Sequence, residues 1–226
     1  MLWINNLMKT MLITGTSRGI GLGCAKKFSN TYNIVGISRT PGEFVTDVGD
    51  LTDNDFRLSI IEKYNPDIFI NNAGIGGSSV KPILDTNSVA SIDLLINFFK
   101  KMKSGSDIIN ISSYSGWQQG NANWSLPLII YSASKHALSA ASQMLASKQE
   151  QIRVMTLEPQ VIETRMTNRD YLTNPVDQSV YDNFDGTRKA PMKVEYIVDV
   201  IEWMISQPRW VNVQTLRLTN SYKYNI

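Results

Sequence analysis

The sequence predicts an α/β fold: a doubly wound parallel sheet covered by helices on both faces, and therefore built in three layers. Two observations lead to this prediction. Short apolar runs of strand type alternate with helix-like segments along the chain, which is the pattern of parallel strands joined by crossover helices. The first of these runs also leads straight into a glycine-rich turn and a helix, an order that is common in the first strand–helix unit of such sheets.

Strands are expected where short apolar runs are bounded by polar residues, Gly or Pro, at 9–14, 33–38, 44–48, 67–71, 107–112, 152–157 and 216–219. Between the second and third strands only residues 39–43 are left for a connection. A parallel crossover needs about a dozen residues or more. We therefore expect the helix at this point to be shortened or missing, and the third strand to be short.

Helices are expected at residues 17–29, 52–64, 87–103, 131–149 and 194–206. Thr52 or Asp53 can cap the second helix, because a side-chain oxygen accepts hydrogen bonds from the free N–H groups of a first helical turn. Pro66 breaks the pattern after this helix, and the Ser-Gly-Ser turn at 104–106 closes the third. Met144 and Met204 are expected to be core residues of the last two helices.

Length and composition fit one domain spanning residues 1–226, in which residues 1–7 are a short extension. With one cysteine, Cys24, and one histidine, His136, neither an internal disulfide nor a zinc cluster is expected. The net charge is +2 and acids and bases are interspersed without a basic stripe, so a nucleic-acid partner is not expected. The longest apolar stretches are far below the roughly 20 residues of a membrane span. No signal peptide is read at the N-terminus, and a reducing cytoplasm is the expected location.

The segment from Gly15 to Gly21 has the spacing Gly-x-x-x-Gly-x-Gly at the junction of the first strand and helix. Glycines let the backbone approach a pyrophosphate closely, and a helix N-terminus offers unpaired N–H groups and a favourable dipole. A simple tight turn gives a similar pattern, but the position at the first strand–helix junction favours a dinucleotide site. The expected cofactor contacts are Gly15, Thr16, Ser17, Arg18, Gly19 and Ile20.

Tyr131 and Lys135 lie four residues apart in the helix expected at 131–149, and therefore on one helical face. A free phenol has a pKa near 10 and exchanges protons poorly at neutral pH. A positive charge beside it stabilises the phenolate and lowers the pKa, which suits a general acid or base. An accidental pair on a solvated helix face is the alternative when these two residues are considered alone.

Two more polar segments follow apolar strands, where loops at the carboxyl ends of parallel strands collect ligands. Ser113 can donate its hydroxyl to a substrate carbonyl and share the negative charge that develops on the oxygen. Its neighbour Ser112 better fits the plain role of closing a strand into a turn. Asn71, Ala73 and Gly74 follow the apolar run 68–70 and leave room for a nucleotide.

These motifs occur in the order and approximate spacing of the short-chain dehydrogenase/reductase family, and residues 9–219 resemble its compact branch. The resemblance implies a Rossmann-like fold and pro-S hydride transfer between C4 of a nicotinamide and a carbonyl or secondary alcohol. It implies that Ser113 orients the carbonyl, that Tyr131 protonates it, and that Lys135 holds the nicotinamide ribose and lowers the pKa of Tyr131. Asn87 matches the asparagine that positions a water in a proton relay, with ordinary helix capping as the alternative.

The resemblance also assigns contacts to the two ends of the cofactor. The Asp50 side chain and the Leu51 backbone match the segment beside the adenine, with Asp47 as a second possible register. Ile162 and Thr164 match the stretch that grips the carboxamide.

Three features depart from the family pattern. Gln160 stands where a glycine is usual, which puts the local backbone geometry in question. The interval from Ser113 to Tyr131 is several residues longer than in many members. The chain ends in Leu218-Thr219-Asn220 in place of the common Gly-Gly.

The end of the second strand points to NADP(H) as the cofactor. An enzyme that prefers NAD has an acid there to accept from the ribose 2′-hydroxyl, whereas NADP needs a cation for the extra phosphate. This chain has Ser38 and Arg39 at that point, and Arg18 can approach the same phosphate from the glycine-rich turn. Two solvated surface arginines are the alternative.

The leading hypothesis is a carbonyl reductase that acts on a small ketone or aldehyde, or oxidises the matching alcohol. A 3-oxoacyl thioester reductase is the first alternative, and a catalytically silent NADP-binding regulator is the second. Residues 165–190 are expected to be irregular and to form a substrate lid. Aromatic and polar residues near the pocket either line it or pack the loops themselves: Trp117, Gln118, Trp124, Tyr171, Tyr181 and Phe184.

The family resemblance implies a homodimer or homotetramer, formed through the helix that carries Tyr131 and the helix before it. Small residues in the Tyr131 helix would allow close packing, although packing within one chain explains them equally well: Ala133, Ala137, Ala140 and Ala141.

Overall fold

The computed structural model of the chain describes residues 8–117, 125–148, 151–164, 166 and 190–220. Its strands form one seven-stranded sheet in the order β3-β2-β1-β4-β5-β6-β7, and every pairing is parallel. The strands are β1 (Thr10–Thr14), β2 (Asn33–Ser38), β3 (Asp47–Val48), β4 (Ile68–Asn71), β5 (Asp107–Ile111), β6 (Arg153–Pro159) and β7 (Thr215–Leu218). The strand order reverses between β1 and β4, and in open α/β sheets ligands bind beyond the carboxyl ends of the strands at such a point.

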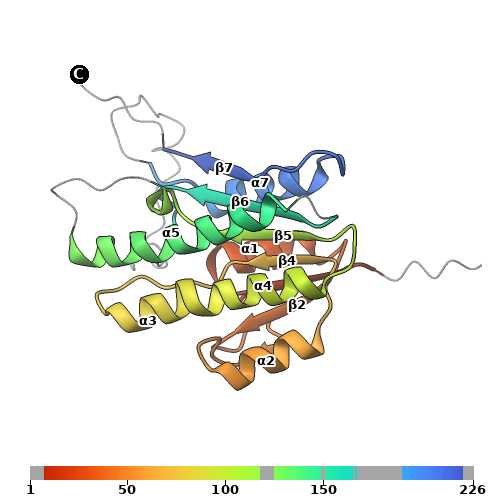
Figure 1. Cartoon of the computed structure of the whole chain (residues 1–226), viewed down its shortest axis with the longest axis horizontal. Helices are drawn as coiled ribbons and strands as arrows, with labels where there is room; N and C mark the ends of the chain where they lie inside the picture. The colour runs from red at the N-terminus through yellow and green to blue at the C-terminus, as the bar shows by residue number, and fades with distance from the viewer. Residues whose placement is uncertain (1–7, 118–124, 149–150, 165, 167–189, 221–226) are drawn as a thin grey trace, which may run out of the picture.

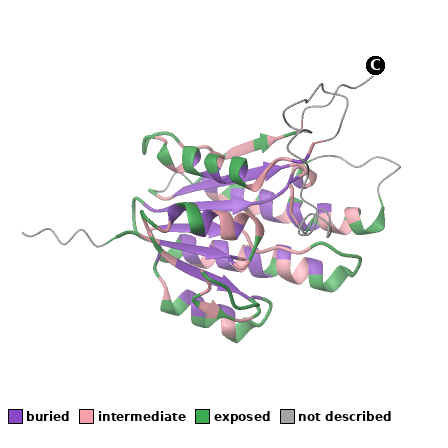
Figure 2. Cartoon of the chain, turned by 180° about the vertical axis from the view of Figure 1, so that it is seen from behind, coloured by how far each residue is buried: buried purple, intermediate pink, exposed green. Residues whose placement is uncertain are grey.

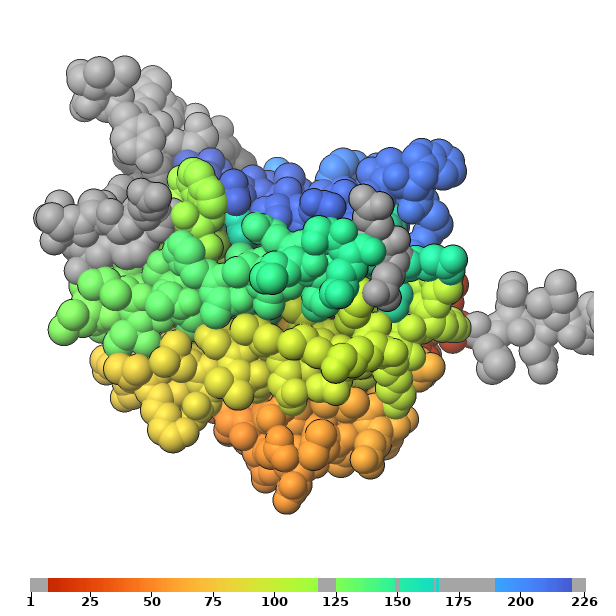
Figure 3. Space-filling model, viewed as in Figure 1, coloured from red at the N-terminus to blue at the C-terminus, as the bar shows by residue number. Residues whose placement is uncertain are grey.

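Helices cover both faces of this sheet, so the predicted three-layer architecture is confirmed (Figure 1). On one face lie α2 (Asn54–Lys63), α4 (Ser91–Lys101) and α5 (Leu126–Ala146), and on the other α1 (Gly19–Phe28) and α7 (Val194–Ser206). The space-filling view shows α4 and α5 side by side across the first face (Figure 3).

Two apolar cores follow from the alternation of side chains along each strand. In β1, Leu12 faces the core under α4 and α5, whereas Met11 and Ile13 face the core under α1 and α7. Phe69 of β4 packs against Phe98 of α4 with ring centroids 4.6 Å apart. The central strands β1, β4, β5 and β6 are consequently buried almost throughout, whereas the edge strands β3 and β7 are not (Figure 2).

The short connection after β2 behaves as predicted: the described residues 39–46 form no helix. The third strand is shorter than expected, two residues instead of 44–48. Phe44 and its neighbours cross close over β2, since a Cβ at Gly36 would lie 1.7 Å from the Phe44 carbonyl oxygen. The Thr46 backbone N–H donates to the Gly36 carbonyl at 2.7 Å, and only after this crossing does a regular strand pairing begin.

Two helix boundaries differ from the prediction. The helix expected at 87–103 starts earlier, as α3 (Val80–Leu84) followed by a π-helical turn η1 (Asp85–Ala90) that leads into α4. The helix expected to begin at Tyr131 begins at Leu126, because Pro127 sits in its first turn, where a missing N–H is harmless. Met204 is buried as expected, but Met144 is 72% exposed on the outer face of α5, so that prediction is wrong.

Some predictions fall on residues outside those that the structure describes. These are the extension at 1–7, the lid at 165–190 except Met166 and Ala190, and the side chains of Gln118, Trp124, Tyr171, Tyr181 and Phe184. Within the described part of the chain, no helix combines the length and the apolar character needed to cross a membrane.

Candidate active site

A cleft of about 1160 Å³ lies at the carboxyl ends of the strands, where the strand order reverses. Most of the residues predicted to bind or react line it. They are Gly15, Ser17, Arg18, Gly19, Ile20, Ser38, Arg39, Asp50, Leu51, Ala73, Gly74, Ser113, Tyr131, Lys135, Ile162 and Thr164.

The glycine-rich turn forms the floor of the cleft. Gly15 has a φ of +80°, a left-handed conformation that favours glycine, and its N–H donates to the Ile37 carbonyl at 2.7 Å. A Cβ at Gly21 would lie 2.3 Å from the Gly15 carbonyl oxygen, so only glycine lets α1 start against the turn. Arg18 precedes the helix without a side-chain cap, which leaves the first N–H groups of α1 available to an anion.

Thr14 and Asn72 join the ends of β1 and β4 beside this turn. The Thr14 Oγ1 accepts from the Asn72 and Ala73 backbone N–H groups at 2.9 Å, and the Asn72 side chain donates to the Thr14 carbonyl at 2.8 Å. The motifs did not single out Asn72, whereas Asn71 was predicted to contact the cofactor. That prediction for Asn71 needs correction: strand alternation turns its side chain toward α4, where it donates to the Ser91 carbonyl at 2.9 Å.

Thr16 also departs from its predicted role. Its side chain is fully buried and does not line the cleft. A Cβ at Gly36 would lie 2.6 Å from the Thr16 Oγ1, so this hydroxyl packs against β2 rather than facing a ligand.

Ser113 and Tyr131 come from two different elements that meet at the end of β5. Ser113 starts the short 3₁₀ turn η2 (Tyr114–Gly116), and its hydroxyl accepts from the Ser115 N–H at 3.1 Å. Tyr131 is half-buried in α5. Burial raises the pKa of its phenol, and the hydrogen bond between this phenol and the Ser113 side chain acts in the opposite direction.

Lys135 follows Tyr131 by one helical turn and is only 3% exposed. Its Nζ donates to the Ile111 carbonyl at 2.9 Å and lies 6.0 Å from the centroid of the Tyr131 ring. Burial lowers the pKa of Lys135 to about 8. The expectation that Lys135 lowers the pKa of Tyr131 is not met in this geometry, because the ammonium bonds to a backbone carbonyl and burial of the phenol dominates.

Asn87 lies in the π-helical turn η1 and is fully buried. Its side chain binds both backbone groups of Ile75, accepting from the N–H at 2.8 Å and donating to the carbonyl at 2.9 Å. It also donates to the Ser134 hydroxyl at 3.1 Å, so it joins the segment after β4 to α5 and is no helix cap. A Cβ at Gly74 would lie 3.3 Å from Asn87 Oδ1 and 3.4 Å from Lys135 Nζ, so these two polar groups flank Gly74 closely.

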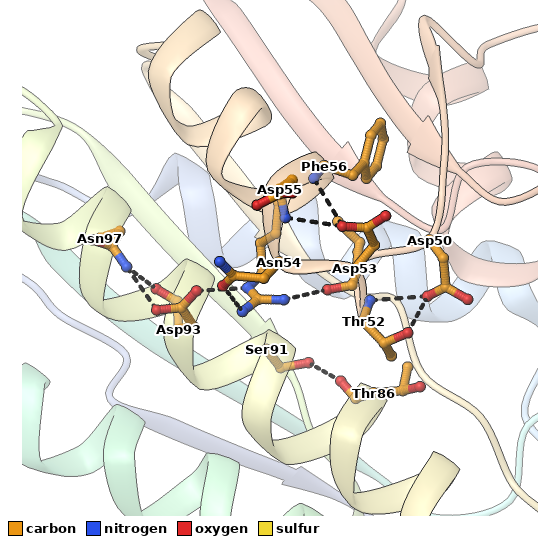
Figure 4. A network of polar contacts seen from close by, with 12 residues as sticks. Asp50, Thr52, Asp53, Asn54, Asp55, Phe56, Thr86, Ser91, Asp93 and Asn97 are labelled. Carbon is orange, nitrogen blue, oxygen red and sulfur yellow. Dashed lines mark hydrogen bonds and ion pairs between the residues drawn. The ribbon is translucent and has the colours of Figure 1, made fainter.

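The segment at Asp50 and Leu51 is held against α2 by a polar network (Figure 4). The Asp50 carboxylate accepts from the backbone N–H and the hydroxyl of Thr52, both at 2.9 Å. The buried Arg57 donates to the Leu51 carbonyl at 2.8 Å. Asp47, the second possible register, pairs instead with Lys63 at 2.7 Å and does not line the cleft.

Two exposed arginines stand at the rim of the cleft beside the end of β2. Arg39 lies 3.9 Å from the Asp50 carboxylate, and Arg18 follows the glycine-rich turn. Between them, the Ser38 hydroxyl donates to the Ser17 hydroxyl at 2.9 Å. Asp50 thus brings a carboxylate to Arg39, whereas β2 itself ends without an acid.

The two departures from the family pattern at Gln160 and Asn220 lie in contact with each other. Gln160 Oε1 accepts from the Asn220 backbone N–H at 2.9 Å, and Asn220 Oδ1 accepts from the Val161 N–H at 3.0 Å. Asn220 also donates to the Ala190 carbonyl at 2.6 Å. The side chains of these two residues thus fix the loop that leads to Ile162 and Thr164.

Metal binding has no support in the part of the chain that the structure describes, where no group of three His, Cys, Asp or Glu side chains converges. The cleft instead has groups that bind phosphate: a glycine-lined turn, free helix N–H groups and two cations. These residues fit a phosphate-bearing cofactor of dinucleotide size.

The chain is similar in sequence to known oxidoreductases. The family model described as short chain dehydrogenase matches residues 44–174. A 3-oxoacyl-acyl-carrier-protein reductase of Chlamydia pneumoniae is 32% identical over 196 residues, which cover 71% of this chain and 76% of the reductase.

Two solved structures are similar over nearly the whole chain. The structure of 4-hydroxyisoleucine dehydrogenase complexed with NADH is 26% identical, with a TM-score of 0.73, and the match covers 95% of this chain and 98% of that one. BdcA in complex with NADPH has a TM-score of 0.76 at 21% identity, with coverage of 95% and 94%. At that identity, the likeness to BdcA shows the shared fold.

Proposed function

The chain belongs to the short-chain dehydrogenase family of oxidoreductases, and from this premise we propose that it transfers hydride between NADP(H) and the carbonyl or secondary alcohol of a small molecule. The observation that carries the proposal is the meeting of Ser113, Tyr131 and Lys135 in the cleft that the glycine-rich turn also lines. A Tyr–Lys pair on a solvated helix face would not produce this arrangement.

The choice of NADP(H) rests on charge at the end of β2. Arg18 and Arg39 are exposed at the rim and carry guanidiniums whose forked donors suit a phosphate. No acid ends β2 to accept from a ribose 2′-hydroxyl. The two similar structures do not decide between the cofactors, since BdcA is complexed with NADPH and 4-hydroxyisoleucine dehydrogenase with NADH.

The cofactor, when bound, supplies or accepts the hydride. The protein's own part in carbonyl reduction is to orient the carbonyl and supply a proton. The Ser113 hydroxyl donates to the carbonyl oxygen, and the Tyr131 phenol, kept protonated by its raised pKa, gives up its proton to that oxygen as negative charge develops. Lys135 Nζ lies 6.0 Å from the centroid of the Tyr131 ring, and its positive charge stabilises the phenolate that this leaves behind.

Asn87 holds this site together from the other side. Its amide is fully used by Ile75 and Ser134, so it fixes the segment after β4 against α5. Asn87 Oδ1 and Lys135 Nζ both flank Gly74, so Asn87 fixes the backbone beside the lysine. We assign Asn87 this supporting place in the relay.

A 3-oxoacyl thioester reductase is the second candidate, and one observation favours it: the reductase of Chlamydia pneumoniae, named for that reaction, is 32% identical. A silent NADP-binding regulator is the candidate from another class. A regulator needs the glycine-rich turn but has no use for a serine and a tyrosine hydrogen-bonded at the end of β5.

The deciding experiment is a screen of NADPH and NADH oxidation over small ketones, aldehydes and an acetoacetyl thioester. The Tyr131→Phe variant is the matched control, because it keeps the ring and removes the proton. We expect turnover with NADPH that falls by about 10² or more in Tyr131→Phe, with NADPH affinity unchanged. Binding of NADPH without turnover of any compound would favour the regulator, and preferred turnover of the thioester would favour the second candidate.

A homodimer or homotetramer through α4 and α5 is part of the same proposal. Two exposed apolar side chains of α5 support it, namely Ile129 and Met144. Sedimentation equilibrium tests it: a monomer across the micromolar range would contradict the proposal, and Met144→Lys should weaken the assembly.

A further inference from the structure

A carboxylate that the reaction does not use, that of Glu158, is completely buried in β6 beneath the helix that carries Tyr131. Its Oε1 accepts from the Ser139 hydroxyl at 2.8 Å, and its Oε2 accepts from Arg217 Nε of β7 at 2.6 Å. We propose that the Glu158–Arg217 pair is a positioning device for proton transfer, which holds the two elements that carry Ser113 and Tyr131 in register. The proposal rests on the function proposed above.

One arm of the device leads to α5. A carboxylate only accepts hydrogen bonds, so Ser139 spends its single hydroxyl hydrogen on Glu158. In the 2.7 Å contact between Ser139 and Ser112, Ser112 must then be the donor. The Ser112 hydroxyl also lies 3.1 Å from the carbonyl of Lys135.

This arm fixes α5 at the level of the reacting groups. Tyr131, Lys135 and Ser139 are spaced by four residues and so follow one stripe of the helix. The bonds that Ser139 makes to Glu158 and Ser112 tie this stripe to β6 and to the end of β5, and together they restrict its rotation and its sliding over the sheet. The three side chains on this path, those of Glu158, Ser139 and Ser112, are nearly or fully buried, so water cannot replace the bonds easily.

The other arm leads to the turn that begins at Ser113. The Arg217 guanidinium lies 4.3 Å from the centroid of the Trp117 ring, a cation–π contact. The Trp117 N–H donates to the Tyr114 carbonyl at 3.1 Å, and the two rings lie 5.7 Å apart. Arg217 therefore presses on the last residue of the turn whose first residue is Ser113.

Glu158 and Arg217 thus join, through one ion pair, two elements that are separate in the sequence and must meet at a substrate. A displacement of about 1 Å between such groups can cost on the order of 100-fold in rate. Loss of the pair should consequently slow the chemical step. The glycine-rich turn lies at the other side of the cleft, so cofactor binding should be unchanged.

The test compares Arg217→Met with a matched control, Arg209→Met. Both arginines are partly exposed, 34% and 44%, and both pair with a buried carboxylate, Glu158 and Asp107. Asp107 begins β5 at the amino ends of the strands, opposite the cleft, and it keeps Arg153 as a partner when Arg209 is replaced. With NADPH and the fastest carbonyl compound of the screen, we expect kcat of Arg217→Met to fall by about 10- to 100-fold, with the KM for NADPH unchanged. Arg209→Met should keep its kcat.

Two further variants separate positioning from stability. Arg217→Lys restores a cation beside Glu158 and should recover much of the lost kcat. The double variant Arg217→Met/Glu158→Gln removes the unpaired buried charge and should recover stability in urea without recovering kcat. An Arg217→Met enzyme with wild-type kcat, or a double variant whose kcat recovers with its stability, would overturn the proposal.

Hydrogen exchange keeps this test separate from the proposed function. If the wild-type protein turns over no carbonyl compound, the function fails and the positioning claim is judged on exchange alone. We then expect Arg217→Met to speed backbone exchange in residues 113–117 and 131–139 together, and Arg209→Met to leave both unchanged. Exchange that rises in one segment only, or in neither, would refute the coupling.

Discussion

The ammonium of Lys135 and the ring of Tyr131 occupy neighbouring turns of α5, yet they are 6.0 Å apart and the ammonium is hydrogen-bonded to the Ile111 carbonyl at 2.9 Å. Two opposing effects follow from the burial of this pair. Desolvation holds the phenol in its protonated form and favours the neutral amine. In the ligand-free cleft Tyr131 is therefore held protonated, and the positive charge of Lys135 becomes important when a negative charge appears on that oxygen.

The burial of Lys135 makes the stability of the ligand-free protein depend on pH. Its pKa is about 8 in the folded state, against an ordinary value of 10.5, so between these values the unfolded chain binds more protons. Stability therefore rises with pH across this window, by about 3 kcal/mol for this residue, and the penalty is fully present below pH 8. Urea unfolding of the wild type and Lys135→Met should show the difference between the two proteins changing over this window. A difference that stays constant with pH would show that Lys135 is not desolvated as described.

The glycine-rich turn predicts a sharp contrast between two alanine substitutions in the same cleft. At Gly21 a Cβ would lie 2.3 Å from the Gly15 carbonyl oxygen, whereas at Gly76 the nearest atom is a flexible methionine carbon 3.8 Å away. Gly21→Ala should lose about 1–3 kcal/mol of stability through overpacking and weaken NADPH binding at least tenfold. Gly76→Ala should bind NADPH as the wild type does. Fluorescence titration measures the NADPH affinity and urea unfolding measures the stability. Equal affinities for the two variants would contradict the role of the glycine-rich turn in binding the cofactor.

Arg39 should decide between the two cofactors. Arg39→Asp removes a charge-assisted bond to the 2′-phosphate, worth about 1.5–3 kcal/mol, and so should raise the Kd for NADPH by roughly 10- to 150-fold. The Kd for NADH should be unchanged or lower, because an aspartate can accept from the 2′-hydroxyl. Lys148 is exposed in the turn after α5, and Lys148→Asp makes the same change in charge and should alter neither constant. An unchanged preference in Arg39→Asp would refute the assignment of NADP(H).

Elements with a strong local signal could be predicted from the sequence. The apolar runs of β1, β4 and β5, the alternation with helices and the missing helix before β3 all follow from residue type and spacing. Gly15, Ser113 and Lys135 could be brought to one cleft because each follows a strand or shares a helix face.

What could not be predicted depends on contacts distant in the sequence. Asn71 and Asn72 are identical as residues, and only the pleat of β4 decides that the first turns toward α4 and the second toward the turn. Whether the pKa of Tyr131 is raised or lowered depends on its burial and on the position of the Lys135 ammonium. A Tyr-x-x-x-Lys spacing predicts neither of these. Likewise, Gln160 and Asn220 look like two separate losses of glycine until the fold places them in contact.

The buried ion pair of Arg153 and Asp107, at the amino ends of β6 and β5, should contribute to stability but not to function. Arg153 is 5% exposed, and its Nε and Nη2 donate to both oxygens of Asp107 at 2.8 Å. Its Nη1 also donates to the Gln207 carbonyl at 2.8 Å, so it ties the loop after α7 to β5 and β6. Arg209 still pairs with Asp107 when Arg153 is removed, but the carboxylate loses its bidentate donor, and Arg153→Met should therefore lose about 1–3 kcal/mol in urea unfolding.

Lys81→Met supplies the contrast for this last substitution. Lys81 pairs with Asp85 on an open helix face with 84% of its side chain exposed, and losing such a pair should change stability by less than about 1 kcal/mol. Folded Arg153→Met should still bind NADPH with wild-type affinity, because the pair lies at the amino end of β5 and β6, away from the cleft. A large loss of affinity with little loss of stability would mean that this edge of the sheet communicates with the cofactor site, which none of the described contacts provides for.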